Sequence, residues 1–173
     1  IDNLKIWNPS SFFFAVTLGI EAGVLEEIQA RGLIVNTAMQ FKHTKTSAII
    51  AVIYSSLLFG LEHFFNLSSG ADIGPTVRTV VFATCCGLYF VALYLRVGSI
   101  IPCIIFHGLI DGLMAYQPLV DTATQSDVST AAAELPIMTQ IINGLIPGGL
   151  LFLIPALFML RKSKWDKILD NFK

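Results

Sequence analysis

The stretch at residues 79–97, TVVFATCCGLYFVALYLRV, decides the fold class of this chain, because it contains no charged residue before Arg96. An uncharged apolar run of this kind can cross the hydrocarbon core of a bilayer as an α-helix, which needs about 20 residues. Of the 173 residues, 54% are hydrophobic and only 13% are charged, whereas about 25% is usual in soluble domains. The sequence therefore predicts an integral membrane protein.

Four further apolar segments resemble this one, so we expect an all-α, polytopic transmembrane helix bundle with five spans. A membrane β-barrel is not expected, because the runs are long and continuous where a barrel has shorter alternating segments. The predicted spans are residues 11–34, with helix continuing to 41, then 47–67, 79–97, 99–116 and 136–160. Residues 1–160 would form the bundle, and residues 161–173 a basic amphipathic tail lying at the interface.

The positions of the basic residues predict the orientation of the bundle. Of 11 Lys and Arg residues, eight fall in the connections on one side, whereas only Lys5 and Arg78 fall on the other. The positive-inside rule then places the C-terminus in the cytoplasm, and we expect the cell membrane as the location. The connection at 117–135 has no Lys or Arg and is expected to be exterior. Since the chain begins with Ile1 rather than Met, we expect a fragment or a processed form, with an odd number of spans upstream if the intact protein starts in the cytoplasm.

Composition also excludes several kinds of partner. The net charge of −1 provides no basic field for nucleic acid, so no nucleic-acid partner is expected. The three cysteines, Cys85, Cys86 and Cys103, all lie inside apolar runs and do not suggest a disulfide framework. We interpret them as small buried hydrophobic residues.

Eight ionisable residues interrupt the predicted spans. Each costs about 2.5–3.5 kcal/mol at the centre of a membrane helix, so such groups face the bundle interior, pair with one another, or serve a function. Eight in five helices are more than packing requires. They are Glu21, Glu26, Glu27, Arg31, Glu62, His63, His107 and Asp111.

The spacing of these residues is ordered. Glu27 and Arg31 are four residues apart, which places them on one helix face and allows an ion pair. The same spacing relates Phe59 to His63 and His107 to Asp111. From the expected turn at 41–47, Glu26 and His63 each lie about 22–24 Å along their helices, at 1.5 Å per residue. The polar side chains can therefore converge on one chamber.

The segments EEIQAR at 26–31, FGLEH at 59–63 and HGLID at 107–111 resemble the EExxxR, FxxxH and HxxxN/D motifs of the CPBP intramembrane protease family. That family comprises CAAX prenyl endopeptidases and bacteriocin-processing or self-immunity proteins. The resemblance covers about residues 19–112. The eight spans usual in the family would put three before Ile1, in agreement with the odd number expected from the charges.

The resemblance implies an intramembrane endopeptidase that acts on a peptide or a membrane-anchored protein, of the prenylated-protein or bacteriocin and pheromone type. Glu26 and His63 would orient and deprotonate a water molecule, and His107 with position 111 would stabilise the oxyanion. The supporting residues would be Glu27, Arg31 and Phe59. Membrane lipid and the substrate are the expected partners.

Asp111 departs from the commoner pattern, in which Asn occupies this position. An ionised Asp cannot donate a hydrogen bond to an oxyanion, so Asp111 is protonated, or it orients His107, or it helps to neutralise a bound cation. The last alternative would make a zinc site from Glu26, His63, His107 and Asp111, although the HExxH pattern is absent.

Other interpretations remain beside this one. Glu21 and Glu62 have no assigned role, and Cys103, four residues before His107, could imitate a Cys–His pair although packing is the commoner role of a buried Cys. Buried Glu, His and Asp also occur in the proton relays of transporters. A scaffold without catalysis could keep the same fold. The ordered occurrence of three motifs favours the protease.

Overall fold

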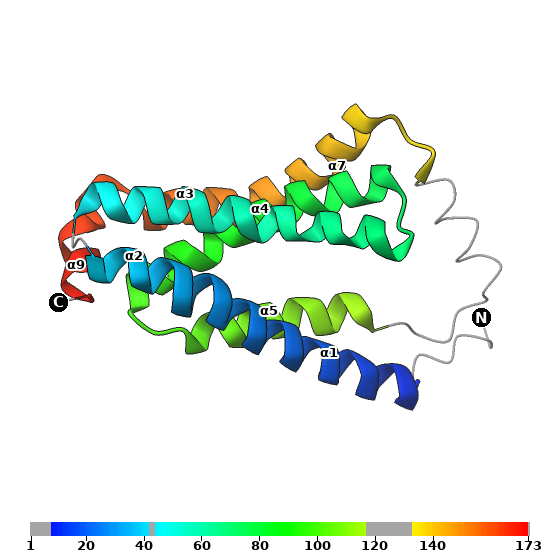
Figure 1. Ribbon diagram of the computed structural model, residues 1–173, viewed down its shortest axis with the longest axis horizontal. Coiled ribbons are helices and arrows are strands. Elements are labelled where there is room, and N and C mark those ends of the chain that lie inside the picture. The colour runs from blue at the N-terminus through cyan, green and yellow to red at the C-terminus, as the bar shows by residue number, and fades with distance from the viewer. Residues whose placement is uncertain (1–7, 42–43, 117–132, 173) are drawn as a thin grey trace.

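The computed structural model describes residues 8–41, 44–116 and 133–172, and every regular element among them is helical. This confirms the all-α prediction. The elements run nearly parallel to one long axis (Figure 1). The predicted exterior connection at 117–135 lies mostly outside the described residues. Lys5, one of the two basic residues on the predicted exterior side, lies outside them as well.

The first helix runs without interruption from Pro9 to Phe41 and has three parts, α1 (Pro9–Glu27), η1 (Ile28–Val35) and α2 (Asn36–Phe41). It begins at Asn8, whose side chain accepts a hydrogen bond from the Ser11 amide, with Pro9 in the first turn. The middle part, η1, is π-helical, so each of its backbone hydrogen bonds spans one more residue than in an α-helix. The expected span at 11–34 with continuation to 41 agrees with this helix.

The second and third predicted spans correspond to α3 with η2 and to α4. Helix α3 (Lys45–Leu61) is capped by Thr44 and tightens into the 3₁₀ segment η2 (Glu62–Ser69). Helix α4 (Ile73–Val97) begins six residues before the predicted span and ends at Gly98, which has a φ of 73°. That left-handed conformation favours glycine, which explains why the helix stops there.

The remaining predicted spans appear with similar bounds. The fourth is α5, at Ile101–Ala115, and the fifth is a continuous helix built from α7 (Ile137–Gly148), η3 (Gly149–Leu153) and α8 (Ile154–Met159). The π-helical η3 lies between Pro147 and Pro155, as expected where prolines remove backbone donors. The tail forms η4 (Lys162–Lys164) and α9 (Trp165–Asp170).

Three of the described helices, rather than the five expected, are long and apolar enough to cross a membrane. They are residues Lys45–Ser69, Ile73–Val97 and Ile137–Met159. Helix α5 is apolar but has only 15 residues, about 22 Å at 1.5 Å per residue. The helix from Pro9 to Phe41 is long enough, but it carries the charged residues that the sequence places in the site.

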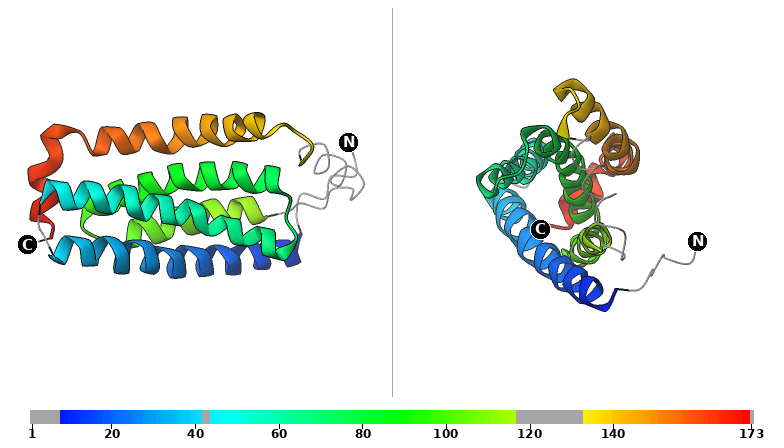
Figure 2. Two further views of the ribbon diagram at one scale, coloured as in Figure 1. Left: turned by 45° about the horizontal axis from the view of Figure 1, so that its top comes forward. Right: turned by 90° about the vertical axis from the view of Figure 1, so that its right-hand side faces the viewer.

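Helix α4 is the centre of the bundle. It packs against α3 on one side and against α7, η3 and α8 on another, and α9 closes over its C-terminal end. Helix α1 packs against α5, and Figure 2 shows this pair beside the group formed by α3, α4 and α7. The largest completely buried side chains of α4 are Phe90 and Leu95.

The contact between α1 and α5 is made by backbones. The buried residues of α1 are Ala15, Gly19, Gly23 and Glu27, a stripe with a spacing of four. A Cβ atom at Gly23 would lie 2.6 Å from the carbonyl oxygen of Ile104, so only glycine fits. This close packing of small residues is typical of membrane helices, and it brings Glu27 against α5.

Many large apolar side chains point outward from the bundle. Phe13 and Leu113, for example, are 68% and 75% exposed. A soluble monomer rarely exposes apolar patches of this extent, whereas lipid covers them at no cost. Together with the three long apolar helices, these surfaces identify an integral membrane protein.

Candidate active site

The three motifs meet where α1 passes into η1. Glu26 and Glu27 are the last residues of α1, and Arg31 lies in η1. His107 lies on the adjacent α5, and Phe59 lies near the end of α3. The side chains from these separate segments come together on one side of α4, as the chamber expected from the sequence requires.

Glu27 is the residue that joins the first motif to the third. Its Oε1 atom lies 2.9 Å from Nη1 of Arg31 and 2.9 Å from Nδ1 of His107. The side chains of Glu27 and Arg31 are completely buried. The ion pair expected from their spacing is therefore present, and it also includes His107, which the sequence did not indicate.

Arg31 is held by α4 as well as by Glu27. Its Nη2 atom donates a hydrogen bond of 3.0 Å to the carbonyl oxygen of Gly87. The guanidinium group lies over the ring of Phe59 at 4.7 Å and over the ring of Phe90 at 5.4 Å. A fully buried guanidinium needs such partners, because an unpaired buried charge is strongly unfavourable. Arg31 thereby connects η1, α3 and α4.

His107 is fixed on several sides and presents one nitrogen to the remaining acids. Phe90 stacks on its ring at 5.2 Å, and Phe59 meets it edge-on at 5.4 Å. The Nε2 atom lies 3.3 Å from Oδ2 of Asp111 and 3.8 Å from Oε2 of Glu26. Unlike Glu27, the side chains of Glu26 and Asp111 are about one-third exposed, so they remain open to a reactant.

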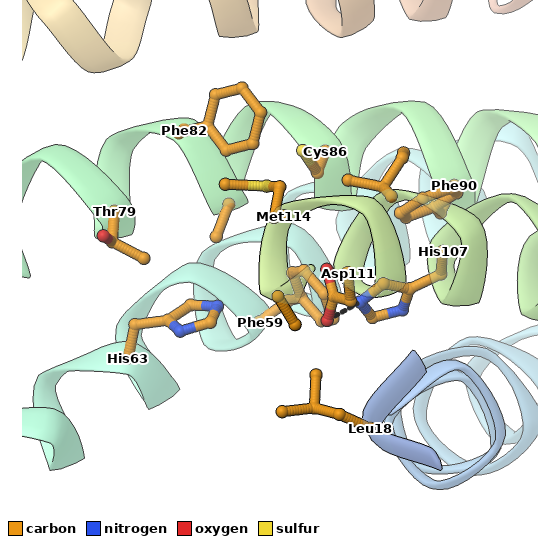
Figure 3. A pocket seen from close by; sticks show the side chains of 13 residues that line it. Leu18, Phe59, His63, Thr79, Phe82, Cys86, Phe90, His107, Asp111 and Met114 are labelled. Carbon is orange, nitrogen blue, oxygen red and sulfur yellow. Dashed lines mark ion pairs between the residues drawn. The ribbon is translucent and has the colours of Figure 1, made fainter. Parts of the chain in front are cut away.

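A cavity of about 290 Å³ lies beside these groups. His107 and Asp111 line it, and so does His63, which comes from η2 (Figure 3). Figure 3 shows the His63 ring pointing toward the side of the cavity where Asp111 lies. Apolar side chains form most of the remaining wall, among them Leu18, Phe82, Phe90, Ile110 and Met114.

His63 lies apart from the other site residues. Its ring is 6.2 Å from the ring of Phe59, and the described residues show no hydrogen bond or ion pair between His63 and Glu26. The histidine that lies near Glu26 is His107, whose Nε2 atom is 3.8 Å from Oε2 of Glu26. The structure thus brings Glu26, His107 and Asp111 together and places His63 on the wall of the same cavity.

Sequence reasoning missed several residues of this site. Gly87 and Phe90 were not singled out, because a carbonyl acceptor and an aromatic ring in an apolar span carry no local signal. The π-helical turn beginning at Ile28 also has no sequence signature, although such turns are frequent at functional sites. The glycines of α1 offered a usable signal, since Gly19 and Gly23 repeat at the spacing seen in Gly108 and Gly112.

The structure also shows where the two acids without an assigned role and Cys103 lie. Glu21 is exposed on α1. Glu62 accepts a hydrogen bond from Nε2 of Gln29 at 2.8 Å. Cys103 is buried, and its thiol points to the carbonyl oxygen of Phe90 at 3.3 Å, which agrees with a packing role.

The donor set does not match a zinc site. Within residues 8–41, 44–116 and 133–172, no group of three or more His, Cys, Asp or Glu side chains is arranged to hold a metal ion. Nδ1 of His107 is engaged by Glu27, and in the described part of the chain His63 forms no hydrogen bond or ion pair with the other three expected ligands. We derive no step through a metal.

These features define a class, that of polytopic membrane proteins with an acid–histidine site enclosed by helices. Residues 8–113 match the family model described as type II CAAX prenyl endopeptidase Rce1-like. The chain belongs to this Rce1-like family of proteases, which confirms the resemblance found in the three motifs. Comparisons with curated proteins and with solved structures gave no match.

Proposed function

We propose that this chain is an intramembrane endopeptidase in which Glu26 and His63 activate a water molecule for hydrolysis of a peptide bond. The observation that carries the proposal is the placement of the Glu26 and Asp111 carboxylates within 3.8 Å of Nε2 of His107, next to a cavity lined by His63. Hydrolysis inside a membrane needs an enclosed water, a base and a donor for the oxyanion. Membership of a protease family supports the same reaction.

Glu26 is the candidate base because its carboxylate is partly open, whereas that of Glu27 is buried and paired. In the proposed reaction, Glu26 takes a proton from the water, and the hydroxide adds to the substrate carbonyl carbon. The carbonyl oxygen becomes the oxyanion. Collapse of this intermediate breaks the C–N bond, and the proton held by Glu26 passes to the leaving amine. His63 would orient the water from the facing wall.

His107 is the candidate donor to the oxyanion. Its Nδ1–H would donate to Oε1 of Glu27, which also pairs with Arg31, so Nε2 is the atom directed at the reacting groups. A proton on Nε2 would be shared between Asp111 and the oxyanion. Of the three interpretations of Asp111, the separation of 3.3 Å favours orientation of His107. Glu27, Arg31 and Phe59 would support this arrangement.

We further propose that the helix at Pro9–Phe41 and α5 lie in the membrane beside the three long apolar helices, which completes five spans. The polar cluster would then be covered by helices on the lipid side. The cell membrane is the proposed location, with the basic tail at Arg161–Lys167 in the cytoplasm. The proposed substrates are prenylated C-terminal peptides, with bacteriocin or pheromone precursors as the other class.

The test is cleavage of an internally quenched farnesylated peptide with a CAAX terminus, by purified protein in liposomes. Glu26→Gln and His63→Ala are each expected to lower the rate by about 10²–10⁴-fold. Glu21→Gln is the matched control, since Glu21 is an exposed carboxylate on the same helix. Equal cleavage by wild type and Glu26→Gln would overturn the proposed mechanism. Proton flux that depends on Glu26 would instead indicate the transporter, and folded protein that binds without cleaving would indicate the scaffold.

A further inference from the structure

One hydrogen bond among the described residues joins a side chain of η1 to a side chain of η2. Nε2 of Gln29 donates to Oε1 of Glu62 at 2.8 Å. Neither Gln29 nor Glu62 occupies a defined position of the three motifs. Among the described residues, neither forms a hydrogen bond or ion pair with His107 or Asp111. The bond matters because its two residues lie close in the sequence to Glu26 and His63.

Gln29 follows Glu26 by three residues, so it lies in the next helical turn, where α1 has become π-helical. Glu62 directly precedes His63 and is the first residue of η2. The bond therefore connects the helical turn after Glu26, the candidate base, to the residue just before His63, the candidate partner of that base. Glu26 and His63 themselves share no described hydrogen bond or ion pair.

A second tie joins the same two segments farther from His63. Oγ of Ser55 donates to the carbonyl oxygen of Ala30 at 3.2 Å, and both residues are buried. Ser55 precedes Glu62 by seven residues, which is two turns of α3. The Ser55 bond fixes the distance between the helices, whereas the Glu62 bond acts at the point where α3 changes into η2.

An amide donor on a carboxylate makes a charge-assisted hydrogen bond, and this one lies on the exposed surface of the bundle. Gln29 supplies the donor without adding a second charge to the pair. Loss of the bond in a membrane would leave two polar groups without their partner, which favours keeping η1 and η2 together.

We propose that Gln29 and Glu62 are positioning residues, which hold Glu26 and His63 at the separation that one shared water molecule requires. This inference rests on the proposed function, because it assigns the pair to water activation. The pair touches neither water nor substrate in this role. It acts by fixing η2 against η1, so that the direction of the His63 ring is set before substrate binds.

The test is an exchange of the two side chains, measured in the same liposome assay. In Gln29→Glu two carboxylates face each other, and we expect kcat to fall at least about tenfold while KM stays within about twofold. Glu62→Gln still allows an amide–amide bond and should lose less than about threefold. The double variant Gln29→Glu/Glu62→Gln restores a donor and a carboxylate and should recover wild-type kcat.

Ser55→Ala is the matched control, because it removes the other tie between the same segments. It is expected to lower the thermal midpoint and to leave kcat within about twofold of wild type. Thermal unfolding of each variant checks that it is folded. A double variant as impaired as Gln29→Glu, or a Gln29→Glu enzyme with unchanged kcat, would overturn the proposal.

A readout without catalysis separates this proposal from the proposed function. The rate at which diethyl pyrocarbonate modifies His63, followed by mass spectrometry, reports the position of its ring. We expect this rate to change by at least about threefold in Gln29→Glu and to return in the double variant. An unchanged rate refutes the positioning role. Wild-type cleavage no faster than that of Glu26→Gln refutes the proposed function, whatever the modification rates are.

Discussion

Nδ1 of His107 lies 2.9 Å from Oε1 of Glu27, although the two residues are 80 positions apart in the chain. The same oxygen contacts Nη1 of Arg31. Glu27 therefore has two roles, of which the EExxxR spacing indicates only the pairing with Arg31. It neutralises a buried arginine, and it fixes which nitrogen of His107 faces the cavity.

Replacement of Glu27 should affect both stability and activity. Glu27→Gln leaves the charge of Arg31 buried without its counter-ion, and breaking such a pair typically costs about 3–5 kcal/mol. We expect a clear fall in the free energy of unfolding and slower peptide cleavage. Glu21→Gln, at an exposed position of the same helix, should change neither. Equal stability of the two variants would contradict the role given to Glu27.

The contact between α1 and α5 should tolerate no side chain. In Gly108→Ala the new Cβ would lie 2.7 Å from the carbonyl oxygen of Gly19, so the helices must separate. We expect a loss of about 1–3 kcal/mol, as for overpacked cores, together with slower cleavage because His107 moves away from Glu27.

Gly149 provides the matched comparison for that variant. Apart from its chain neighbours and the nearby backbone of its own helix, no atom of the described residues lies within 4 Å of a Cβ built there, so Gly149→Ala should be neutral or stabilise the helix by up to about 1 kcal/mol. Unfolding of both variants in detergent gives the difference. The packing explanation would be wrong if Gly108→Ala were as stable as Gly149→Ala.

Asp111 offers a test of the orienting role. In Asp111→Asn the side-chain carbonyl oxygen can still accept a hydrogen bond from Nε2 of His107, so cleavage should stay within about tenfold of wild type. Asp111→Leu has no acceptor and should lose about 10²–10⁴-fold. Rates of both variants on the quenched peptide make the comparison. If the Asn variant were as inactive as the Leu variant, the carboxylate would have a role beyond orientation.

Phe59 should contribute mainly to stability and to the geometry around Arg31. Its ring contacts the guanidinium group at 4.7 Å and the His107 ring at 5.4 Å, and it is 4% exposed. Phe59→Ala should cost about 3–5 kcal/mol, the usual range for a buried aromatic residue. Phe13→Ala removes a ring exposed on the outer face of α1 and should cost little in the free energy of unfolding. A small effect of Phe59→Ala would show that the cavity wall repacks.

The tail depends on tertiary contacts that can be tested in the same way. Nδ2 of Asn171 donates to the carbonyl oxygens of Leu95 and Arg96 at 3.0 and 3.2 Å, at the C-terminal end of α4. These carbonyls have no partner within the helix. Asn171→Ala should therefore lower stability by about 1–2 kcal/mol. Lys167→Ala, an exposed change in the same tail, should leave the free energy of unfolding unchanged.

Much of the fold could be predicted from periodicity and hydropathy, because both are local properties. The ends of the helices followed from the apolar runs to within a few residues, except at α4, where six further residues extend the helix toward Ile73. The sequence predicts five spans, and three of the described helices meet the criteria of length and charge for crossing a membrane. The acids in α1 and the 15 residues of α5 are the reasons, and both belong to the site.

The sequence indicated a set of candidate site residues but not the contacts between them. The motifs indicated Glu26, Glu27, Arg31, His107 and Asp111, since charged side chains stand out in apolar helices. They could not indicate that Glu27 would contact His107, nor that His63 would lie on the wall of the cavity.

The sequence alone determined the membrane environment, the helical class and the family, because each depends on residue types and on spacing within one segment. The contacts between these side chains depend on the tertiary structure, because residues of α1, α3, α4 and α5 that are far apart in the sequence meet in space. The glycine contact between α1 and α5 is the physical reason. It lets two backbones approach closely enough for Glu27 to reach His107, and that approach selects which nitrogen faces the reacting groups.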